Sequence, residues 1–293
     1  MGPLIADSSE SRVNEAMSFH SASLTALQTA PLQQHPAFGA ALTHLGRPAL
    51  RLSLPSQGVE VQVLRQRFGP LRLGLISRGR LSRDQLDRLK RASDCNFLLL
   101  NAETPGHYPG WKVRTPAHVA EIALDAPARL LRARMAQKWR NRLNKAADQG
   151  LKVSQTALPA DPGHWLLRID QAQQVVKRYR GYPPRLTAAY AAANRGQARL
   201  FEVRRWGEPI AAMLFLCHGE VATYHIGWTG DEGRAVSAHH LALWEAMIQL
   251  QARGITRIDL GLVDTETAPG LARFKLGSGA LCRPLGGTWL MRL

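Results

Sequence analysis

Residues 199–228 decide the fold, and they read RLFEVRRWGEPIAAMLFLCHGEVATYHIGW. Two short turns, which contain Gly207 and Gly219, separate three runs of largely apolar residues. The runs are Arg199–Arg204, Ile210–Cys217 and Val221–Trp228. Glycine is among the residues that reverse a chain most readily, so this spacing predicts a three-stranded antiparallel meander.

Helices and strands alternate after this meander. We expect a glycine loop at 230–233, then a helix, a strand, a short helix and a closing strand. Their predicted ranges are Ala238–Arg253, Ile255–Leu260, Pro269–Leu276 and Gly286–Leu293. Such alternation favours a mixed sheet flanked by helices.

The preceding part of the chain predicts a second mixed unit. We expect a meander over 49–76, a helix over Leu81–Ala92, and strands over Asn96–Leu100 and Val119–Leu124. Residues 1–20 are polar and predict a flexible tail. The predicted organisation is a tail over 1–20, a first unit over 21–125 and a second unit over 126–293. The predicted fold class is α/β (α+β), with mixed, mostly antiparallel sheets flanked by helices.

Residues 126–150 predict a long amphipathic helix with two stripes. The apolar stripe is Leu131, Met135, Trp139 and Leu143, and the basic stripe is Arg134, Lys138, Arg142 and Lys145. Like charges at four-residue spacing destabilise a helix unless an anion relieves them. The basic stripe is therefore either a docking surface for an anionic partner or a solvated helix face.

The overall charge is strongly positive. Lys and Arg total 38 against 22 Asp and Glu, a formal net charge of +16. Such an excess favours polyanionic partners such as tRNA, an acyl carrier protein or a phosphorylated donor. The alternative is an arginine-rich composition with no binding role.

The remaining composition argues against export and metal chemistry. The longest apolar run, Ile210–Cys217, is too short to span a bilayer, and no secretory signal opens the chain. The three cysteines match no metal or redox spacing. No histidine pair has zinc-binding spacing. We expect a cytoplasmic protein without a transmembrane segment or a metal site.

Several C-terminal motifs resemble those of one enzyme family. They are Tyr224–Trp228, Leu241 with Trp244, Ile258–Gly261, Gly270-Leu271, Phe274-Lys275 and Gly277. They resemble the Fem-type peptidyltransferase branch of the GNAT acyltransferase superfamily, over roughly residues 130–293. The resemblance implies tandem GNAT-like units, with the first unit degenerate.

The phosphate-binding loop departs from the ordinary GNAT pattern. GNAT enzymes open the helix after the third strand with a basic, glycine-rich loop that binds the pyrophosphate of coenzyme A. Here the corresponding residues, Gly230–Ala235, read GDEGRA, so two carboxylates replace the leading cation. Fem-type enzymes also lack the standard loop and use aminoacyl-tRNA, so the departure favours this branch.

Four residues are candidates for catalysis. By resemblance, Lys275 binds the donor or stabilises the oxyanion; alternatively it is a surface lysine at a helix end. Asp259 ends a predicted strand, where open sheets often place function, or it pairs with a neighbouring arginine. Tyr224 and His225 are adjacent on one strand and point to opposite sides. Either one is an acid–base candidate, or both are structural.

Seven residues are candidates for donor binding. Ser237 is the predicted N-cap of the following helix, whose first free N–H groups would face a phosphate together with Arg234. The full set is Arg234, Ser237, Ala238, Phe274, Arg134, Lys138 and Arg142. The alternative is a simple cap with solvated cations.

Together these features predict an N-acyltransferase. It would transfer an acyl group from acyl-CoA or an acyl carrier to an amine, with no bound cofactor. One alternative is an aminoacyl-tRNA-dependent peptidyltransferase of Fem type. The other is a non-catalytic GNAT-fold protein that binds nucleic acid.

Overall fold

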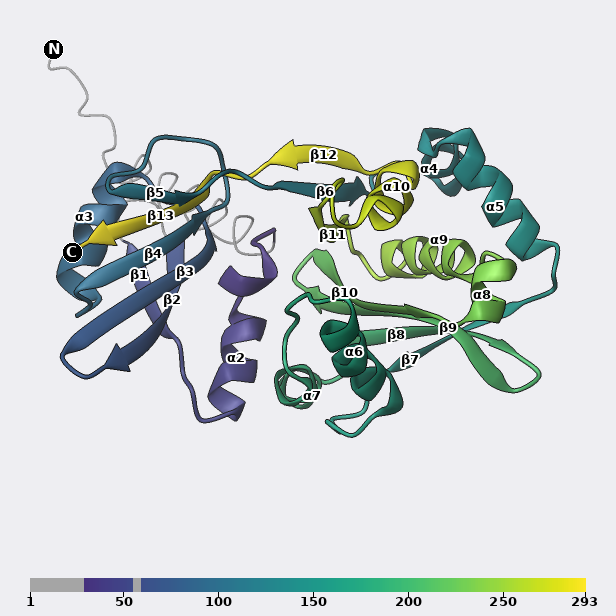
Figure 1. Cartoon of the computed structure of the whole chain (residues 1–293), viewed down its shortest axis with the longest axis horizontal. Helices are drawn as coiled ribbons and strands as arrows, with labels where there is room; N and C mark the ends of the chain where they lie inside the picture. The colour runs from purple at the N-terminus through teal and green to yellow at the C-terminus, as the bar shows by residue number, and fades with distance from the viewer. Residues whose placement is uncertain (1–28, 55–58) are drawn as a thin grey trace, which may run out of the picture.

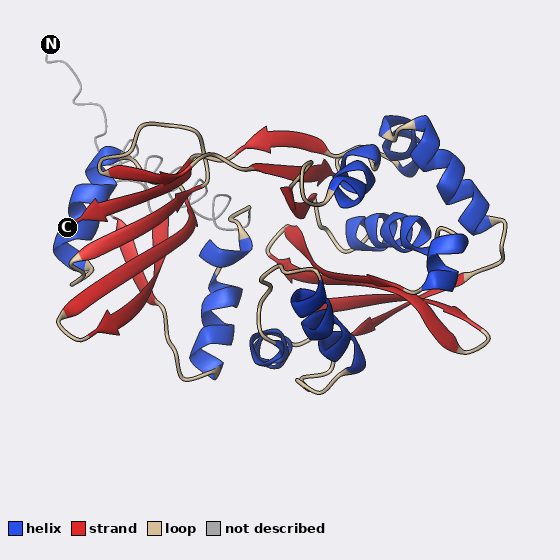
Figure 2. Ribbon diagram, in the orientation of Figure 1, coloured by secondary structure: helices blue, strands red, loops and turns tan. Residues whose placement is uncertain are grey.

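Two β-sheets carry the fold in the computed structural model, which describes residues 29–54 and 59–293 (Figure 1). The tail predicted for residues 1–20 lies outside the described residues. The first sheet has six strands in the order β1-β2-β3-β4-β13-β5, and the second has seven in the order β12-β6-β11-β10-β9-β8-β7. Helices flank both sheets (Figure 2), so the predicted mixed architecture is confirmed.

The first sheet contains the predicted N-terminal meander. Its strands are β1 (Leu50–Leu54), β2 (Val59–Phe68), β3 (Leu71–Gly79), β4 (Phe97–Ala102), β5 (Trp111–Arg114) and β13 (Gly287–Arg292). Helix α3 (Arg83–Ala92) packs on one face, and its leucines Leu86 and Leu89 join the core of this sheet. The short helices η1 (Leu32–Gln34) and α2 (Pro36–His44) lie on the other side of the sheet, next to β1 and β2.

The second sheet contains the meander of residues 199–228. Its strands are β6 (His118–Ala123), β7 (Lys152–Ala157), β8 (Ala198–Arg205), β9 (Glu208–His218), β10 (Val221–Thr229), β11 (Arg257–Val263) and β12 (Leu281–Pro284). Its helices are α4 (Ala128–Arg134), α5 (Gln137–Ala147), α6 (Trp165–Val176), α7 (Pro184–Ala193), α8 (Asp231–Ala235), α9 (Ala238–Gln251) and α10 (Pro269–Gly277). In the described ranges, no helix is long and apolar enough to cross a bilayer.

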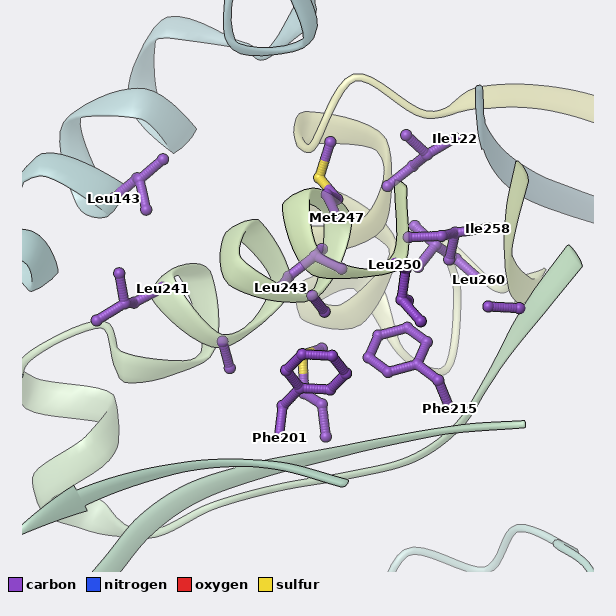
Figure 3. Packing of buried hydrophobic residues seen from close by; sticks show 14 of the residues in the cluster. Ile122, Leu143, Phe201, Phe215, Leu241, Leu243, Met247, Leu250, Ile258 and Leu260 are labelled. Atoms are coloured by element: carbon purple, nitrogen blue, oxygen red, sulfur yellow. The ribbon is translucent and has the colours of Figure 1, made fainter. Parts of the chain in front are cut away.

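The apolar run of β9 is buried on both faces. Met213 and Phe215 point into the core under α9, whereas Leu214 and Leu216 point into the core formed with α6 and α7. Figure 3 shows the α9 side, where Phe215 lies beneath the helix. A central strand covered on both faces explains why this run is continuously apolar rather than alternating.

Strands cross between the two sheets. Strand β13, from the C-terminal end of the described chain, lies between β4 and β5 of the first sheet. Strand β6, which precedes residue 126, pairs with β11 and β12 of the second sheet. The strand content of the sheets therefore does not follow the expected division at residue 126. Strands β5 and β12 were not predicted, since each is only four residues long.

The prediction of one long helix over 126–150 is wrong in one respect. It is broken into α4 and α5, because Met135 and Ala136 have extended backbones. The backbone N–H of Ala136 donates to the carbonyl of Gly277 at 2.9 Å, which anchors the break to the end of α10. Met135, Trp139 and Leu143 are nevertheless all buried, as the apolar stripe predicts.

Candidate active site

The second sheet splits between β10 and β11. The two strands pair in parallel only from Val221 to Thr223, opposite Arg257 to Asp259. Beyond that point β10 continues along β9 and β11 continues along β6. The register of β11 against β6 shifts after Asp259, and Gly261 has a φ of 75° that favours glycine. This bulge re-aims the backbone at the split.

Lys275 projects from α10 to the backbone of β11. Its side chain is buried, and its Nζ donates to the carbonyl oxygen of Leu262 at 2.7 Å. Burial lowers the pKa of Lys275 to about 8, although the negative charge of Asp259 opposes this shift. Lysine has three donors, and the described residues occupy one of them. The simple reading of Lys275 as a solvated lysine at a helix end is therefore wrong.

Asp259 is a buried carboxylate with both oxygens hydrogen-bonded. Oδ1 accepts from the backbone N–H of Gly261 at 2.7 Å, and Oδ2 accepts from Nη1 of Arg78 at 2.6 Å. An arginine partner matches the alternative reading of Asp259, but the arginine comes from the first sheet. The carboxylate is therefore held in one orientation beside Lys275.

Arg78 belongs to a charged network that joins the two sheets. It lies at a register shift between β3 and β4. Its backbone φ is 56°, which is uncommon for a residue other than glycine. Glu103 accepts from both Arg78 and Arg283, and Glu121 pairs with Arg283 and Arg257. Burial lowers the pKa of Arg78, but Glu103 and Asp259 outweigh it and raise that pKa. The guanidinium thus stays charged.

The sequence patterns did not predict that these network residues lie at the site. Arg78, Glu103, Glu121 and Arg283 are far apart in the chain, and no local motif connects them. Tyr182 is a further omission: its ring lies 5.6 Å from that of His225, and burial raises its pKa. The only signal for Tyr182 in the sequence is its place directly before two prolines.

Tyr224 and His225 lie where the register of β10 against β9 shifts, and they contact different parts of the protein. Tyr224 packs against Phe215, and its hydroxyl lies over Gly227, where a Cβ would clash with it. The Nε2 of His225 is 2.8 Å from Oγ1 of Thr187 on α7. Burial raises the pKa of Tyr224 and lowers that of His225 to about 4. No direct bond connects either side chain to Lys275 in the described chain.

The residues after β10 form a short helix where a glycine loop was predicted. In α8, Arg234 forms an ion pair with Asp231 and donates to the carbonyl of Thr229 at 2.7 Å. Glu232 pairs with Arg205 at 3.0 Å. The positive charge of Arg234 is therefore already matched within α8.

The predicted side-chain cap at Ser237 is wrong. Ser237 does precede α9, but its φ of 60° places it in the left-handed region, and its side chain makes no capping bond. The following Ala238 is fully buried. Phe274 stacks on His239 at 5.6 Å, so this candidate lies beside the start of α9.

The basic stripe is divided by the helix break. Arg134, on α4, pairs with Asp125, and Lys145 donates to the carbonyl of Ala235 at 2.9 Å. Lys138 and Arg142, on α5, are exposed and form no ion pair within the described residues. Only this pair remains available for an anionic partner.

Comparisons with known proteins identify the family. Residues 132–276 match a family described as the acetyltransferase (GNAT) domain. These residues form a GNAT domain, which indicates an acyltransferase. No curated protein matches its sequence.

Its whole fold is similar to that of FemX, at 14% identity and a TM-score of 0.71, over 94% of this chain and 96% of that one. A conserved protein of unknown function from Bacteroides thetaiotaomicron gives 11% identity and a TM-score of 0.56, over 95% and 96% of the two chains. The C-terminal domain of a putative lysylphosphatidylglycerol synthetase from Agrobacterium fabrum gives 11% and 0.54, over 94% and 90%. The Fem-like fold is thus confirmed.

Proposed function

We propose that this acyltransferase moves an acyl group from acyl-CoA or an acyl carrier to an amine at the split between β10 and β11. One observation carries the proposal: the buried Lys275 lies at this split with donors to spare. In a GNAT domain, a cation in a desolvated position is suited to stabilise charge that develops on the acyl carbonyl.

The reaction requires little covalent chemistry from the protein. The acceptor nitrogen attacks the acyl carbon, the bond from that carbon to the donor sulfur or oxygen breaks, and the amine proton passes to the leaving atom. Lys275 donates to the carbonyl oxygen as it becomes negative. Asp259, held by Arg78 and Gly261, attracts the acceptor while it is still an ammonium ion.

Tyr224 and His225 are the two candidates for proton transfer. His225 is neutral at pH 7, because burial lowers its pKa to about 4, so it can accept a proton from the attacking amine. Tyr224 keeps its proton over the same range, because burial raises its pKa, so it can donate to the leaving atom. Both roles require the substrate to bridge the space to these side chains.

Donor binding would use the start of α9 and the face of α5. The first N–H groups of α9 have no intrahelical partner, and Phe274 beside them can contact the acyl arm. Lys138 and Arg142 would receive a larger anionic donor such as an acyl carrier protein. A cytoplasmic location fits such donors.

Aminoacyl-tRNA is a second candidate donor, and α8 favours it. By the resemblance to GNAT enzymes, Asp231 and Glu232 take the place of residues in the loop that binds the coenzyme A pyrophosphate, and Asp231 is almost fully exposed. Two carboxylates repel a pyrophosphate at this position. A donor with its phosphates elsewhere avoids this repulsion.

Parallel transfer assays test these proposals. The protein is incubated with acyl-CoA, acyl carrier protein or aminoacyl-tRNA, together with a panel of amines, and products are measured by mass spectrometry. We expect amide formation with one donor class, and loss of that product in Lys275→Met. Amide formation that survives unchanged in Lys275→Met would exclude the proposed site.

A further inference from the structure

The first sheet has an apolar face that the described helices leave largely uncovered. Its cross-strand register aligns Leu64, Leu75, Leu99, Leu290 and Trp111 in one row across five strands. Residues that pair across strands share a face, so this row is continuous. At the usual strand spacing, four intervals span roughly 19 Å.

Two further rows extend the same face toward the β2–β3 turn. Leu73 pairs with Phe97, and Phe68 pairs with Leu71. We call these nine side chains the open face: Leu64, Phe68, Leu71, Leu73, Leu75, Phe97, Leu99, Trp111 and Leu290. None of them is buried, and Phe68 and Trp111 are 60% and 62% exposed.

The opposite face of the same sheet is fully packed. Ile76, Leu98, Leu100 and Met291, the neighbours of the open-face residues along each strand, are buried in the core under α3. On the open side, η1 lies over the ends of β2 and β3, where Gln34 bonds to the backbone of Gln62 and to the carbonyl of Ser77. Leu64, at one end of the main row, packs against the core that η1 and α2 help to form, and the other open-face residues lie beyond this core. Figure 1 shows α3 and α2 on opposite sides of this sheet. Large uncovered apolar surfaces of this kind mark binding sites.

The charge around the open face is positive. Strands β3, β4, β5 and β13 contain no acidic residue. Arg292 pairs with Phe97 in the second row and is exposed, without an ion pair in the described ranges. A second copy of the chain would bring the same cations together, which is unfavourable, whereas an anion would be attracted.

The open face ends next to the candidate active site. The next row across the sheet is polar and consists of Ser77, Asn101 and Thr288, with Thr288 bonded to Asn101 at 3.0 Å. Arg78 follows Ser77 directly, and its guanidinium contacts Asp259. An apolar surface therefore leads through a polar row to the buried charges beside Lys275.

We propose that the open face binds the hydrocarbon chain of a single-chain anionic amphiphile, with its polar end directed toward Arg78. Binding itself follows from the face and its charge. The further conclusion that this amphiphile is one of the two acyl-transfer substrates rests on the proposed function.

Binding is measured by isothermal titration calorimetry of the whole chain with dodecyl phosphate below its critical micelle concentration. We expect saturable binding with a negative heat-capacity change, the signature of apolar burial. The triple variant Leu75→Thr, Leu99→Thr and Leu290→Thr should weaken it by at least about tenfold, the lower end for a lost apolar contact. Threonine suits exposed strand positions, and circular dichroism checks folding. Leu281→Thr, on exposed β12, is the matched control.

A charge test accompanies the apolar test. Arg114→Gln, which alters the exposed arginine paired with Thr288 in the polar row, should weaken binding of dodecyl phosphate but not of dodecyltrimethylammonium. Lys275→Met should bind dodecyl phosphate like the wild type, so loss of acyl transfer and loss of amphiphile binding are separable. Unchanged affinity in the triple variant would overturn the proposal.

Three other results would also overturn the proposal, because each would assign the open face to a different partner. Sedimentation of the wild type as a dimer and of the triple variant as a monomer, without probe binding, would assign the face to a second copy. Binding to phosphatidylglycerol vesicles but not to monomeric dodecyl phosphate would assign it to a membrane surface. Probe binding only after deletion of residues 1–28 would assign it to the chain's own N-terminal segment.

Discussion

Nη1 of Arg78 lies 2.6 Å from Oδ2 of Asp259, so a side chain of the first sheet orients a carboxylate of the second. The two residues are 181 positions apart in the chain. Because the charge of Asp259 acts on Lys275, this bond makes the electrostatics of the candidate site depend on both sheets. The first sheet is thus more than a degenerate copy of the second.

Replacement of Arg78 should therefore destabilise the protein and alter the site. Arg78→Met leaves Glu103 and Asp259 with a missing partner, and such a loss in a buried pair typically costs about 3–5 kcal/mol. Chemical denaturation measures this cost. Arg80→Met, which alters an exposed arginine two residues away, should stay within about 0.5 kcal/mol of the wild type.

The same variant has a second readout in the pH profile. Without Arg78, Asp259 interacts more strongly with Lys275, and a repelling cation is also lost, so the pKa of Lys275 should rise. Any alkaline limb of kcat/KM should move to higher pH in Arg78→Met. If the alkaline decline of kcat/KM stays at the same pH, Arg78 does not influence the pKa of Lys275.

Sequence patterns predicted the local part of this site and could not predict the rest. Lys275 and Asp259 belong to one strand–helix unit, so a motif was enough to connect them. Arg78 reaches Asp259 only because a bulge with a left-handed residue re-aims it, and no periodicity encodes that event. The break at Met135 was equally hidden, because the apolar spacing is the same on either side of it.

The sheet that β13 joins could not be predicted, for a similar reason. Residues 287–292 were predicted as a strand, and they bury alternate side chains as a strand does, but such a pattern does not reveal which sheet the strand joins. Its partners β4 and β5 are fixed by tertiary packing of Trp289 and Met291 under α3. Residue types alone therefore predicted the element and not its neighbours.

Lys138 and Arg142 should account for the salt dependence of polyanion binding. The double variant Lys138→Gln and Arg142→Gln should bind tRNA more weakly and reduce the slope of log K against log salt by about two, one per lost phosphate contact. Arg134→Gln should change little, because Asp125 already pairs with Arg134. Filter binding at several salt concentrations measures both. Equal slopes in all variants would leave Lys138 and Arg142 as solvated side chains.

Buried histidines should make the fold sensitive to acid. Burial lowers the pKa values of His35, His225, His239 and His240 from 6.5 to about 4. Between these values the unfolded chain binds more protons than the folded one, so stability falls as pH drops from 6.5 toward 4. Each histidine contributes a slope of up to about 1.4 kcal/mol per pH unit.

Denaturant titrations across this pH range measure the slope. His225→Gln keeps a hydrogen-bonding group near Thr187 and removes one titrating ring, so the slope should decrease. His44→Gln, an exposed position on α2, is the control and should leave it unchanged. An identical slope in His225→Gln would mean that this ring titrates normally in the folded protein.

Gly227 should be required for the position of Tyr224. A Cβ at residue 227 would collide with the Tyr224 hydroxyl, so Gly227→Ala should cost about 1–3 kcal/mol, as overpacking does. Gly270→Ala, where a Cβ meets open space, should be nearly neutral. Thermal denaturation compares the two. Equal stability of both variants would show that Tyr224 moves aside freely.

The role of Lys275 gives the sharpest test of the proposed chemistry. If its ammonium stabilises the developing oxyanion, Lys275→Met should lower kcat by about 10²–10³, which corresponds to roughly 3–4 kcal/mol, with a small change in KM. A role in donor binding would instead raise KM and spare kcat. Arg273→Met, an exposed arginine on the same helix, is the control. A change in kcat/KM below about twofold, under roughly 0.5 kcal/mol, would place Lys275 outside the reaction.

The pH dependence tests the charge of Lys275 directly. Its pKa is about 8, so the ammonium predominates below that pH and is lost above it. With hydroxylamine as acceptor, which is already neutral at pH 7, kcat/KM should therefore fall about tenfold per pH unit above pH 8. Arginine stays protonated throughout this range, so an active Lys275→Arg variant should show no such decline. A decline that persists in Lys275→Arg belongs to another group, and the oxyanion role would then have to be given to that group.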